Sequence, residues 1–252
     1  MNKTALVTGA TSGIGKATAF MLAKHKYNLI ITGRRLKRLL EFKNELTEKF
    51  NIEVLTLNFD IRNREETKKQ IENLPEKFQN IDILINNAGL ASGLDLIHEG
   101  NIDDWEKMID TNIKGLLYIS RAVMPKMTER KTGHIVNISS IAGKETYLKG
   151  NVYCATKHAV ESLTKAMRID MLPYGIKVTS VAPGAVNTEF SLVRLGNKEA
   201  ADKVYEGYMP LLAQDIADAV EFAITRPPHV NINELLIMPT AQANSSHLHR
   251  NE

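Results

Sequence analysis

The chain has 252 residues, of which 43% are hydrophobic and 24% charged, and its formal net charge is only +3. This is the composition of an ordinary folded protein, and the length is sufficient for one large hydrophobic core. Because blocks of like charge are absent, the sequence lacks the pattern of a nucleic-acid-binding protein. The apolar runs are too short and too interrupted to span a membrane. We therefore expect one domain that has neither nucleic acid nor membrane as a partner.

The cysteine and histidine content bears on location and metal binding. Cys154 is the only cysteine, which excludes an intrachain disulfide and favours a reducing compartment. We interpret it as a small packed thiol rather than a nucleophile. The first predicted strand starts by Lys3, so we expect no signal peptide and a cytoplasmic protein. The seven histidines show no metal-ligand spacing, and no metal is expected.

A glycine-rich turn follows the first predicted strand, Lys3–Thr8. It reads Gly9-Ala10-Thr11-Ser12-Gly13-Ile14-Gly15 and leads into a helix with an apolar face. Glycine lets the backbone approach a pyrophosphate, and the free amides at a helix N-terminus attract anions. Three glycines within seven residues after a strand make an ordinary turn the weaker interpretation. The spacing is G-x-x-x-G-x-G rather than the standard dinucleotide fingerprint.

The second predicted strand, Asn28–Thr32, ends in Gly33-Arg34-Arg35. A site for NAD places Asp or Glu near this point to accept a hydrogen bond from the ribose, whereas arginine there accommodates a 2′-phosphate. The acid is missing, and two guanidinium groups suited to bidentate phosphate binding follow. Arg34 and Arg35 also begin a basic helix, and the two interpretations can coexist. We favour NADP(H) as the cofactor.

Strand and helix patterns alternate along the remaining chain. Further strands are predicted at residues 53–59, 82–86, 134–139, 177–182 and 235–238, and a long helix at Val152–Leu172. This alternation predicts an α/β, Rossmann-like, doubly wound parallel sheet of about seven strands with helices on both faces. Without a linker or repeat, residues 1–240 form one cofactor-binding catalytic domain. Residues 241–252 are a polar C-terminal tail, and a disordered end is preferred for them.

Tyr153 and Lys157 are separated by one helical turn, and Ser140 lies thirteen residues before the tyrosine. Residues i and i+4 share one face of a helix, so the phenol and the ammonium group can meet. A nearby cation favours the phenolate, so we expect a pKa of Tyr153 below the ordinary value of about 10. Such a tyrosine suits general acid/base chemistry at an alcohol or carbonyl. Alone, however, a Y-x-x-x-K pair is weak, because a half-buried tyrosine beside a solvated lysine is commoner.

Several motifs in order resemble the single-domain form of the short-chain dehydrogenase/reductase family, from Lys3 to about Pro239. They are Thr8–Gly15, Asn86–Gly89, Thr111-Asn112, Ile138–Ser140, Tyr153-x-x-x-Lys157 and Pro183-Gly184. The resemblance implies that Tyr153 donates the proton during reduction and that Lys157 lowers its pKa and binds the nicotinamide ribose. It implies that Ser140 holds the substrate oxygen. Asn112 is expected to interrupt its helix and hold a water linked to Lys157.

The same resemblance implies further contacts with NADP(H), all at the C-terminal ends of strands. Asp60 and Ile61 are expected at the adenine, and residues 183–188 at the nicotinamide carboxamide. The complete predicted cofactor set is Gly9, Thr11, Ser12, Gly13, Ile14, Gly15, Arg34, Arg35, Asp60, Ile61, Asn87, Ala88, Gly89, Tyr153, Lys157, Pro183, Gly184, Val186 and Thr188.

The segment 189–212 breaks the regular alternation, and in the family this stretch is a mobile lid over the substrate. We predict Phe190 and Arg194, with Ser140, as substrate residues. Arg194 is the best candidate to bind a substrate carboxylate, although a surface arginine on a flexible loop has nearly equal weight. Segments such as Thr188–Arg194 and His229–Asn233 are similar to the NADP-dependent 3-hydroxy acid dehydrogenases, which include serine and allo-threonine 3-dehydrogenases and malonic semialdehyde reductases. Lys144–Thr146 and Leu148-Lys149 are more charged than that subgroup leads us to expect.

The resemblance therefore implies an enzyme that interconverts a 3-hydroxy acid and its 3-oxo acid. Two alternatives stay open: a broader carbonyl reductase acting on ketones, sugars or acyl thioesters, and a non-catalytic NADP-sensing regulator. The family's usual homotetramer would be held by helices at Trp105–Met127 and Val152–Leu172, and also by Asn233–Pro239.

Overall fold

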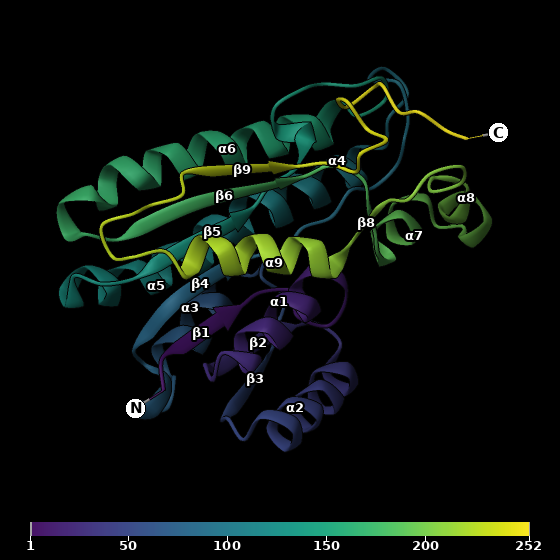
Figure 1. The fold of residues 1–252 in the computed structure, drawn as a ribbon. Coiled ribbons are helices and arrows are strands. Elements are labelled where there is room, and N and C mark those ends of the chain that lie inside the picture. Colours follow the sequence, from purple (N-terminus) through teal and green to yellow (C-terminus); the bar gives the residue numbers. More distant parts are fainter. Residues whose placement is uncertain (1, 252) are drawn as a thin grey trace.

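The structure is a computed structural model that describes residues 2–251, and its centre is a seven-stranded parallel sheet (Figure 1). The strand order is β3-β2-β1-β4-β5-β6-β9. The strands are β1 (Thr4–Val7), β2 (Asn28–Gly33), β3 (Val54–Asn58), β4 (Ile81–Asn86), β5 (His134–Ile138), β6 (Lys177–Pro183) and β9 (Glu234–Ile237). The order turns back at β1, as in a doubly wound sheet. The predicted fold class is confirmed, and the strand bounds agree to within one or two residues.

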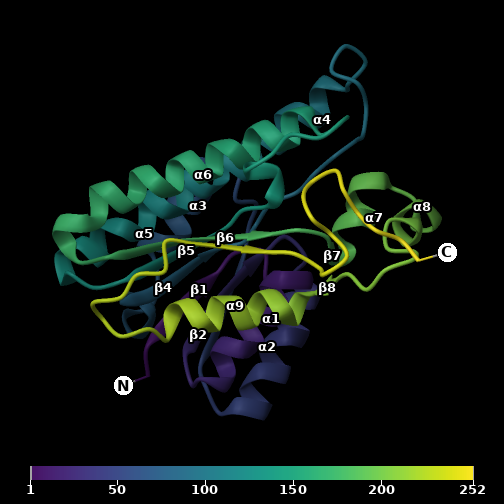
Figure 2. The same ribbon diagram turned by 45° about the horizontal axis from the view of Figure 1, so that its top comes forward.

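Helices cover both faces of the sheet (Figure 2). One face carries α1 (Gly13–Lys24), α2 (Leu36–Phe50) and α9 (Ala213–Ile224), and α1 packs against α9. The other carries α3 (Arg64–Glu72), α5 (Leu116–Arg130) and α6 (Asn151–Met171), with α4 (Ile102–Ile109) beside α6. β1 is buried along its whole length, because both of its faces are covered. The sheet therefore has two hydrophobic cores, one on each side.

The helix predicted across Trp105–Met127 is not continuous. A π-helical segment at Asp110–Gly115 separates α4 from α5. Such bulges insert an extra residue and re-aim side chains, and they occur often at functional sites. The segment contains Asn112, which agrees with the predicted local interruption of the helix.

The segment after β6 leaves the sheet and forms a small separate structure at one end of the molecule (Figures 1 and 2). It contains β7 (Val186–Asn187), α7 (Glu189–Leu195), α8 (Lys198–Lys203) and β8 (Leu211–Leu212), and β7 pairs with β8. We call residues 186–212 the lid. Its helices are short, and Ser191 in α7 and Ala201 in α8 are their only buried residues, so little apolar burial holds the lid in place.

The C-terminal segment differs from the expected disordered end. Gln242 forms an isolated bridge with Leu248, and the amide of Asn251 donates to the Gly207 carbonyl in the lid at 2.7 Å. Arg250 also donates to the Val204 carbonyl, at 3.0 Å. Long-range backbone contacts, which composition does not reveal, therefore place this segment against the lid. Across residues 2–251, no helix combines the length and the apolar character needed to cross a membrane.

Candidate active site

One cavity of about 660 Å³ runs along the C-terminal ends of the strands, where open α/β sheets bind ligands. It is lined by β1–α1, by the ends of β2 to β6, by α6 and by the lid. Of the residues predicted from the sequence to form the site, all except Gly15 and Asn112 lie on its wall. The structure therefore gathers motifs spread over residues 9–194 into one continuous site.

The glycine-rich turn has the backbone geometry of an anion cradle. Gly9 and Gly13 have positive φ angles of 66° and 52°, which residues with a side chain rarely adopt. Gly15 lies beneath the loop instead, because a Cβ there would be 2.4 Å from the Gly9 carbonyl oxygen. Ser12, the N-cap of α1, makes no side-chain hydrogen bond to the helix. The first amides of α1 are therefore free of a side-chain cap and face the cavity end of the loop.

Asn87 and Thr8 hold the loop against the end of β4. The Thr8 hydroxyl accepts from the amides of Asn87 and Ala88 at 3.0 and 2.9 Å. Asn87 Nδ2 donates to the carbonyls of Thr8 and Gly9 at 2.9 and 3.2 Å. These bonds join the two strand ends that flank the switch point of the sheet. Sequence reasoning missed the contribution of Thr8.

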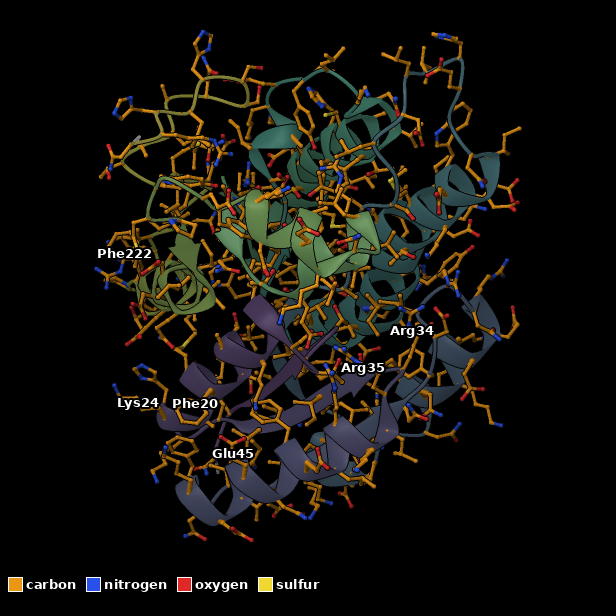
Figure 3. The ribbon with its side chains drawn as sticks, turned by 90° about the vertical axis from the view of Figure 1, so that its right-hand side faces the viewer. Phe20, Lys24, Arg34, Arg35, Glu45 and Phe222 are labelled. Atoms are coloured by element: carbon orange, nitrogen blue, oxygen red, sulfur yellow. The ribbon has the colours of Figure 1, made fainter. Side chains whose placement is uncertain are left out.

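Arg34 and Arg35 lie close together (Figure 3), and both line the cavity. Arg35 donates to the hydroxyls of Thr11 and Ser12 at 2.6 and 2.7 Å and forms an ion pair with Glu189 at 2.7 Å. Arg34 lies 3.8 Å from Asp60. Both guanidinium groups remain about half exposed, at 58% and 42%. Gly33 has no side chain, and a Cβ there would lie 2.9 Å from the Thr11 methyl carbon. A β2 end without an acid, beside two accessible cations, fits a nucleotide that carries a 2′-phosphate.

Asp60 is held in an ion pair at the same end. Its carboxylate accepts from the Arg62 guanidinium at 2.6 Å. Burial acts to raise the pKa of Asp60, but the hydrogen bonds and charges of Arg62 and Arg34 outweigh it, so that this pKa lies below its ordinary value. Asp60 and Ile61 are on the cavity wall, as the predicted adenine contact requires.

Tyr153 and Lys157 project from one face of α6 into the opposite end of the cavity, and both are buried. Lys157 Nζ donates to the Ile138 carbonyl at 3.0 Å and lies 6.0 Å from the centroid of the Tyr153 ring. A Cβ at Gly89 would meet Asn112 Oδ1 at 3.2 Å and Lys157 Nζ at 3.5 Å. A glycine at this position therefore allows α6, β4 and the π-helix to converge.

Asn112 lies just behind the cavity wall, with only 2% of its surface exposed. Its Oδ1 accepts from the Leu90 amide at 2.9 Å, and its Nδ2 donates to the Leu90 carbonyl at 2.8 Å and to Thr156 at 3.0 Å. The side chain thus fixes the loop after β4 to α6. Its contacts in the structure are these positioning bonds.

The predicted lowering of the pKa of Tyr153 by Lys157 is wrong for this structure. Burial raises the pKa of Tyr153 above its ordinary value, and interactions with Ser140 and Arg194 only partly oppose it. Burial also lowers the pKa of Lys157 to about 8. The reason is physical: both groups are desolvated, which disfavours the charged form of each, and spacing along a helix does not reveal burial.

Ser140 begins a short 3₁₀ turn, Ile141–Gly143, in extended backbone conformation. Its Oγ accepts from the Ala142 amide at 3.1 Å and stays on the cavity wall beside Tyr153. This fixed hydroxyl can donate to an oxygen held next to the tyrosine.

Pro183 at the end of β6, and Gly184, Val186 and Thr188 after it, also line the cavity. The Ala185 amide donates to Gln242 Oε1 at 2.8 Å. Thr188 caps α7 by accepting from the Phe190 amide at 3.2 Å. Gln242 was missed by sequence reasoning, since no local pattern links residue 242 to residue 185.

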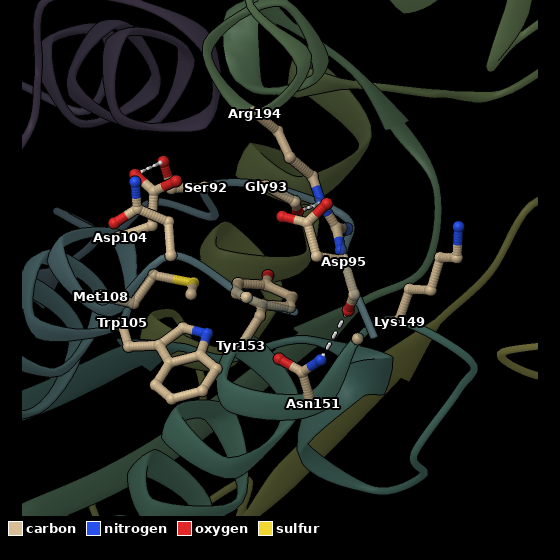
Figure 4. A pocket seen from close by; sticks show the side chains of 13 residues that line it. Ser92, Gly93, Asp95, Asp104, Trp105, Met108, Lys149, Asn151, Tyr153 and Arg194 are labelled. Atoms are coloured by element: carbon tan, nitrogen blue, oxygen red, sulfur yellow. Dashed lines mark hydrogen bonds between the residues drawn. The ribbon is translucent and has the colours of Figure 1, made fainter. Parts of the chain in front are cut away.

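Phe190 and Arg194 project from α7 over Tyr153. The Phe190 ring lies 5.7 Å from the Tyr153 ring, and the Arg194 guanidinium carbon lies 5.5 Å from the centroid of the tyrosine ring. Arg194 also donates to the hydroxyl of Tyr147 at 2.9 Å and to the Gly93 carbonyl at 3.3 Å. Figure 4 shows its side chain descending from α7 toward Gly93 and Asp95, above Tyr153. A small side pocket of about 10 Å³ lies beside this group.

The structure thus adds Tyr147 to the predicted set of substrate residues.

The unexpected charge of Lys144–Thr146 and Leu148-Lys149 has a structural explanation in part. Lys144 forms ion pairs with the buried Glu161 and with Glu234, each at 2.6 Å. Cys154 is buried and is not part of a disulfide. Within residues 2–251, no group of three or more His, Cys, Asp or Glu side chains has the arrangement of a metal site.

Comparisons with known proteins agree with this geometry. A family model described as short chain dehydrogenase matches residues 3–195. An NADP-dependent 3-hydroxy acid dehydrogenase of Schizosaccharomyces pombe is 44% identical over 99% of this chain and 97% of its own. A serine 3-dehydrogenase of Rhizobium radiobacter is 44% identical, with 96% of both chains covered.

Solved structures are similar as well. The closed form of a serine dehydrogenase complexed with NADP+ superimposes with a TM-score of 0.91 at 43% identity, covering 98% of this chain and 100% of the other. The chain belongs to the short-chain dehydrogenase family.

Proposed function

We propose that this protein is an NADP(H)-dependent oxidoreductase that interconverts a 3-hydroxy acid, of the serine, allo-threonine or 3-hydroxypropionate type, and its 3-oxo acid. One observation carries the proposal: a single cavity joins the arginines of the β2 end to Tyr153, with Arg194 above the tyrosine. The names of the similar proteins, an NADP-dependent 3-hydroxy acid dehydrogenase and a serine 3-dehydrogenase, support it.

The residues present fit NADP(H). The glycine-rich turn and the uncapped start of α1 would hold the pyrophosphate, and Arg34 and Arg35 the 2′-phosphate. Asp60 and Ile61 would meet the adenine, and Asn87–Gly89 with residues 183–188 the nicotinamide half. The nicotinamide supplies or accepts the hydride when bound.

The proton chemistry belongs to the chain. Burial keeps Tyr153 protonated, so it has a proton to donate to the substrate oxygen, which becomes strongly basic as the hydride adds during reduction. Ser140 donates a hydrogen bond to the same oxygen and stabilises the charge that develops there. Lys157, with a pKa near 8, is positioned to hold a proton close to Tyr153. Asn112 keeps the β4 loop and α6 in register around them.

Arg194 gives the proposed substrate its second anchor. Its guanidinium is fixed by Tyr147 and by the Gly93 carbonyl, so it is already oriented toward the space above Tyr153. A guanidinium binds a carboxylate in a bidentate manner. A hydroxy acid whose hydroxyl lies at Tyr153 would reach Arg194 through its carboxylate, whereas a neutral alcohol has no partner there.

Steady-state kinetics test the proposal. Reduction of NADP+ should be followed with L-serine, L-allo-threonine, D-threonine, 3-hydroxypropionate and 3-hydroxyisobutyrate, with simple alcohols as controls. The expected result is activity with at least one hydroxy acid and little with the alcohols. Activity confined to the alcohols would reject the hydroxy-acid assignment in favour of a broader carbonyl reductase.

An Arg194→Ala variant tests the carboxylate anchor. Loss of a charge-assisted hydrogen bond is worth about 1.5–3 kcal/mol, so kcat/KM for the hydroxy acid should fall about tenfold to a hundredfold. Activity with a neutral carbonyl should be spared. The matched control is Arg226→Ala, because Arg226 lies outside the cavity and stacks on Phe222. Equal losses for charged and neutral substrates would assign Arg194 to the structure of the lid.

Further features belong to the same proposal. We infer a cytoplasmic homotetramer that binds no nucleic acid, with residues 1–240 as the catalytic domain and 241–252 as a C-terminal tail, of which Arg250 and Asn251 contact the lid. The exposed apolar side chains of Ile169, Leu172 and Leu236 support an assembly surface. Light scattering at micromolar concentration checks it, and a monomer would count against it.

A further inference from the structure

Glu189 forms ion pairs with two arginines at the open end of the cavity. Arg35 Nη1 donates to Glu189 Oε2 at 2.7 Å, and Arg38 Nη1 donates to Oε1 and Oε2 at 2.7 and 3.0 Å. Among residues 2–251, Glu189 is the one carboxylate paired with Arg35. The other nitrogens of that guanidinium are held by the hydroxyls of Thr11 and Ser12. Glu189 therefore occupies the edge of Arg35 that is not bound to the glycine-rich turn.

Glu189 is also the first residue of α7, which reaches the substrate end of the cavity. Phe190, the next residue, packs against Tyr153, and Arg194 at the other end of the helix is bonded to Tyr147. The helix thus has one end on the arginines and the other on the wall above the catalytic tyrosine. A change in the partner of Glu189 would therefore act directly on the position of Phe190.

We propose that Glu189 is a positioning residue that competes with the 2′-phosphate of the cofactor for Arg35, and thereby makes the seating of α7 above Tyr153 depend on that phosphate. The inference rests on the proposed function, since it requires Arg35 to bind the phosphate.

The competition follows from charge and geometry. The edge of Arg35 that a phosphate would need is the one that Glu189 occupies, so the phosphate would have to displace the carboxylate from Arg35. The two negative charges would then lie close together, and like charges at that distance repel. Arg38 holds both oxygens of Glu189, so it can retain the carboxylate once Arg35 has changed partner. The side chains are 40–46% exposed, and exchange between such partners is inexpensive because exposed ion pairs are weak.

Binding of 2′,5′-ADP and 5′-AMP to the full-length protein, measured by calorimetry, tests the competition without turnover. Glu189→Gln should bind 2′,5′-ADP about two- to fivefold more tightly than the wild type, the range expected for one exposed ion pair. Binding of 5′-AMP should not change. Glu199→Gln is the matched control, because Glu199 also lies in the first turn of a lid helix but pairs with Lys203. It should leave both affinities unchanged.

Hydrogen exchange of peptides covering residues 189–195 tests the effect on α7. In the wild type, 2′,5′-ADP should raise exchange above the level seen with 5′-AMP, because it removes Arg35 from Glu189. In Glu189→Gln the two nucleotides should give equal exchange.

The outcomes separate this inference from the proposed function. A wild type that prefers 2′,5′-ADP, with Glu189→Gln showing the same or a weaker affinity for it, overturns the competition alone. A wild type that binds both nucleotides equally contradicts the assignment of the arginines to a phosphate. If Glu189→Gln and Glu189→Ala both lose 5′-AMP binding, Glu189 is a structural residue of the fold and the inference fails.

Discussion

The two ends of the cavity use charge in opposite ways. At the catalytic end, Tyr153 and Lys157 are each 7% exposed, and burial dominates the pKa of both. At the phosphate end, Arg34, Arg35 and Glu189 are 40–58% exposed, and their ion pairs can be exchanged at low cost. One end is dry and fixed and controls a proton. The other is solvated and adaptable and recognises an anion.

The largest effect is expected at the dry end. Tyr153→Phe removes the proton donor while keeping the ring that packs against Phe190, so kcat should fall by about 10²- to 10⁴-fold. Affinity for 2′,5′-ADP, measured by calorimetry, should be unchanged. Near-normal kcat in this variant would remove Tyr153 from the chemistry.

The next effect is expected at the solvated end. Arg34→Asp with Arg35→Ala should raise the KM for NADPH about tenfold to a hundredfold, because charge-assisted contacts with the 2′-phosphate are lost. The KM for NADH should change far less. Steady-state kinetics with both cofactors decides, and equal changes in the two values would contradict the assignment of this end to the phosphate.

Stability measurements sharpen the contrast, because burial of Lys157 has a cost. The pKa of Lys157 is about 8 in the folded protein, against an ordinary value of 10.5 that applies to the unfolded chain, so between these values the unfolded chain binds more protons. The stability of the wild type should therefore rise with pH across this window, and the full cost is present below pH 8. Lys157→Met should be more stable than the wild type at pH 7 by about 1–3 kcal/mol in urea unfolding, although inactive. An advantage that does not shrink toward pH 10.5 would argue against a buried charge as its cause.

The smallest effect is expected from salt. Raising the ionic strength should weaken 2′,5′-ADP binding about two- to fivefold, because exposed charges are screened. The value of kcat at saturating cofactor should stay nearly constant, since the buried catalytic groups are shielded. Titrations at low and high salt check this, and a salt-dependent kcat with salt-independent binding would reverse the comparison.

How much of the structure the sequence could predict depends on how far apart along the chain the interacting residues lie. The strand–turn–helix at Gly9–Gly15 and the shared face of Tyr153 and Lys157 depend on neighbours a few residues apart, and local spacing predicted both. The pairing of Glu189 with Arg35 and that of Arg194 with Tyr147 join segments 154 and 47 residues apart. No periodicity encodes them, and the same holds for Gln242 at Ala185.

Burial explains the remaining differences between the predictions from the sequence and the structure. The spacing of Tyr153 and Lys157 correctly placed the two groups together but gave the wrong direction for the pKa of Tyr153, because desolvation depends on what the sheet and lid bring over α6. Likewise, the polar composition of residues 241–252 suggested disorder, whereas backbone bonds to the lid are the deciding interaction.

The most direct test of the account is the rate of NADPH formation by the wild-type protein with NADP+ and a 3-hydroxy acid, compared with the rate with NAD+ at the same concentration. The account predicts stoichiometric formation of NADPH and the 3-oxo acid, and a much lower rate with NAD+. NADP+ binding without turnover of any hydroxy acid or reduction of any carbonyl would contradict it, and would instead identify the chain as an NADP-sensing protein that kept the fold.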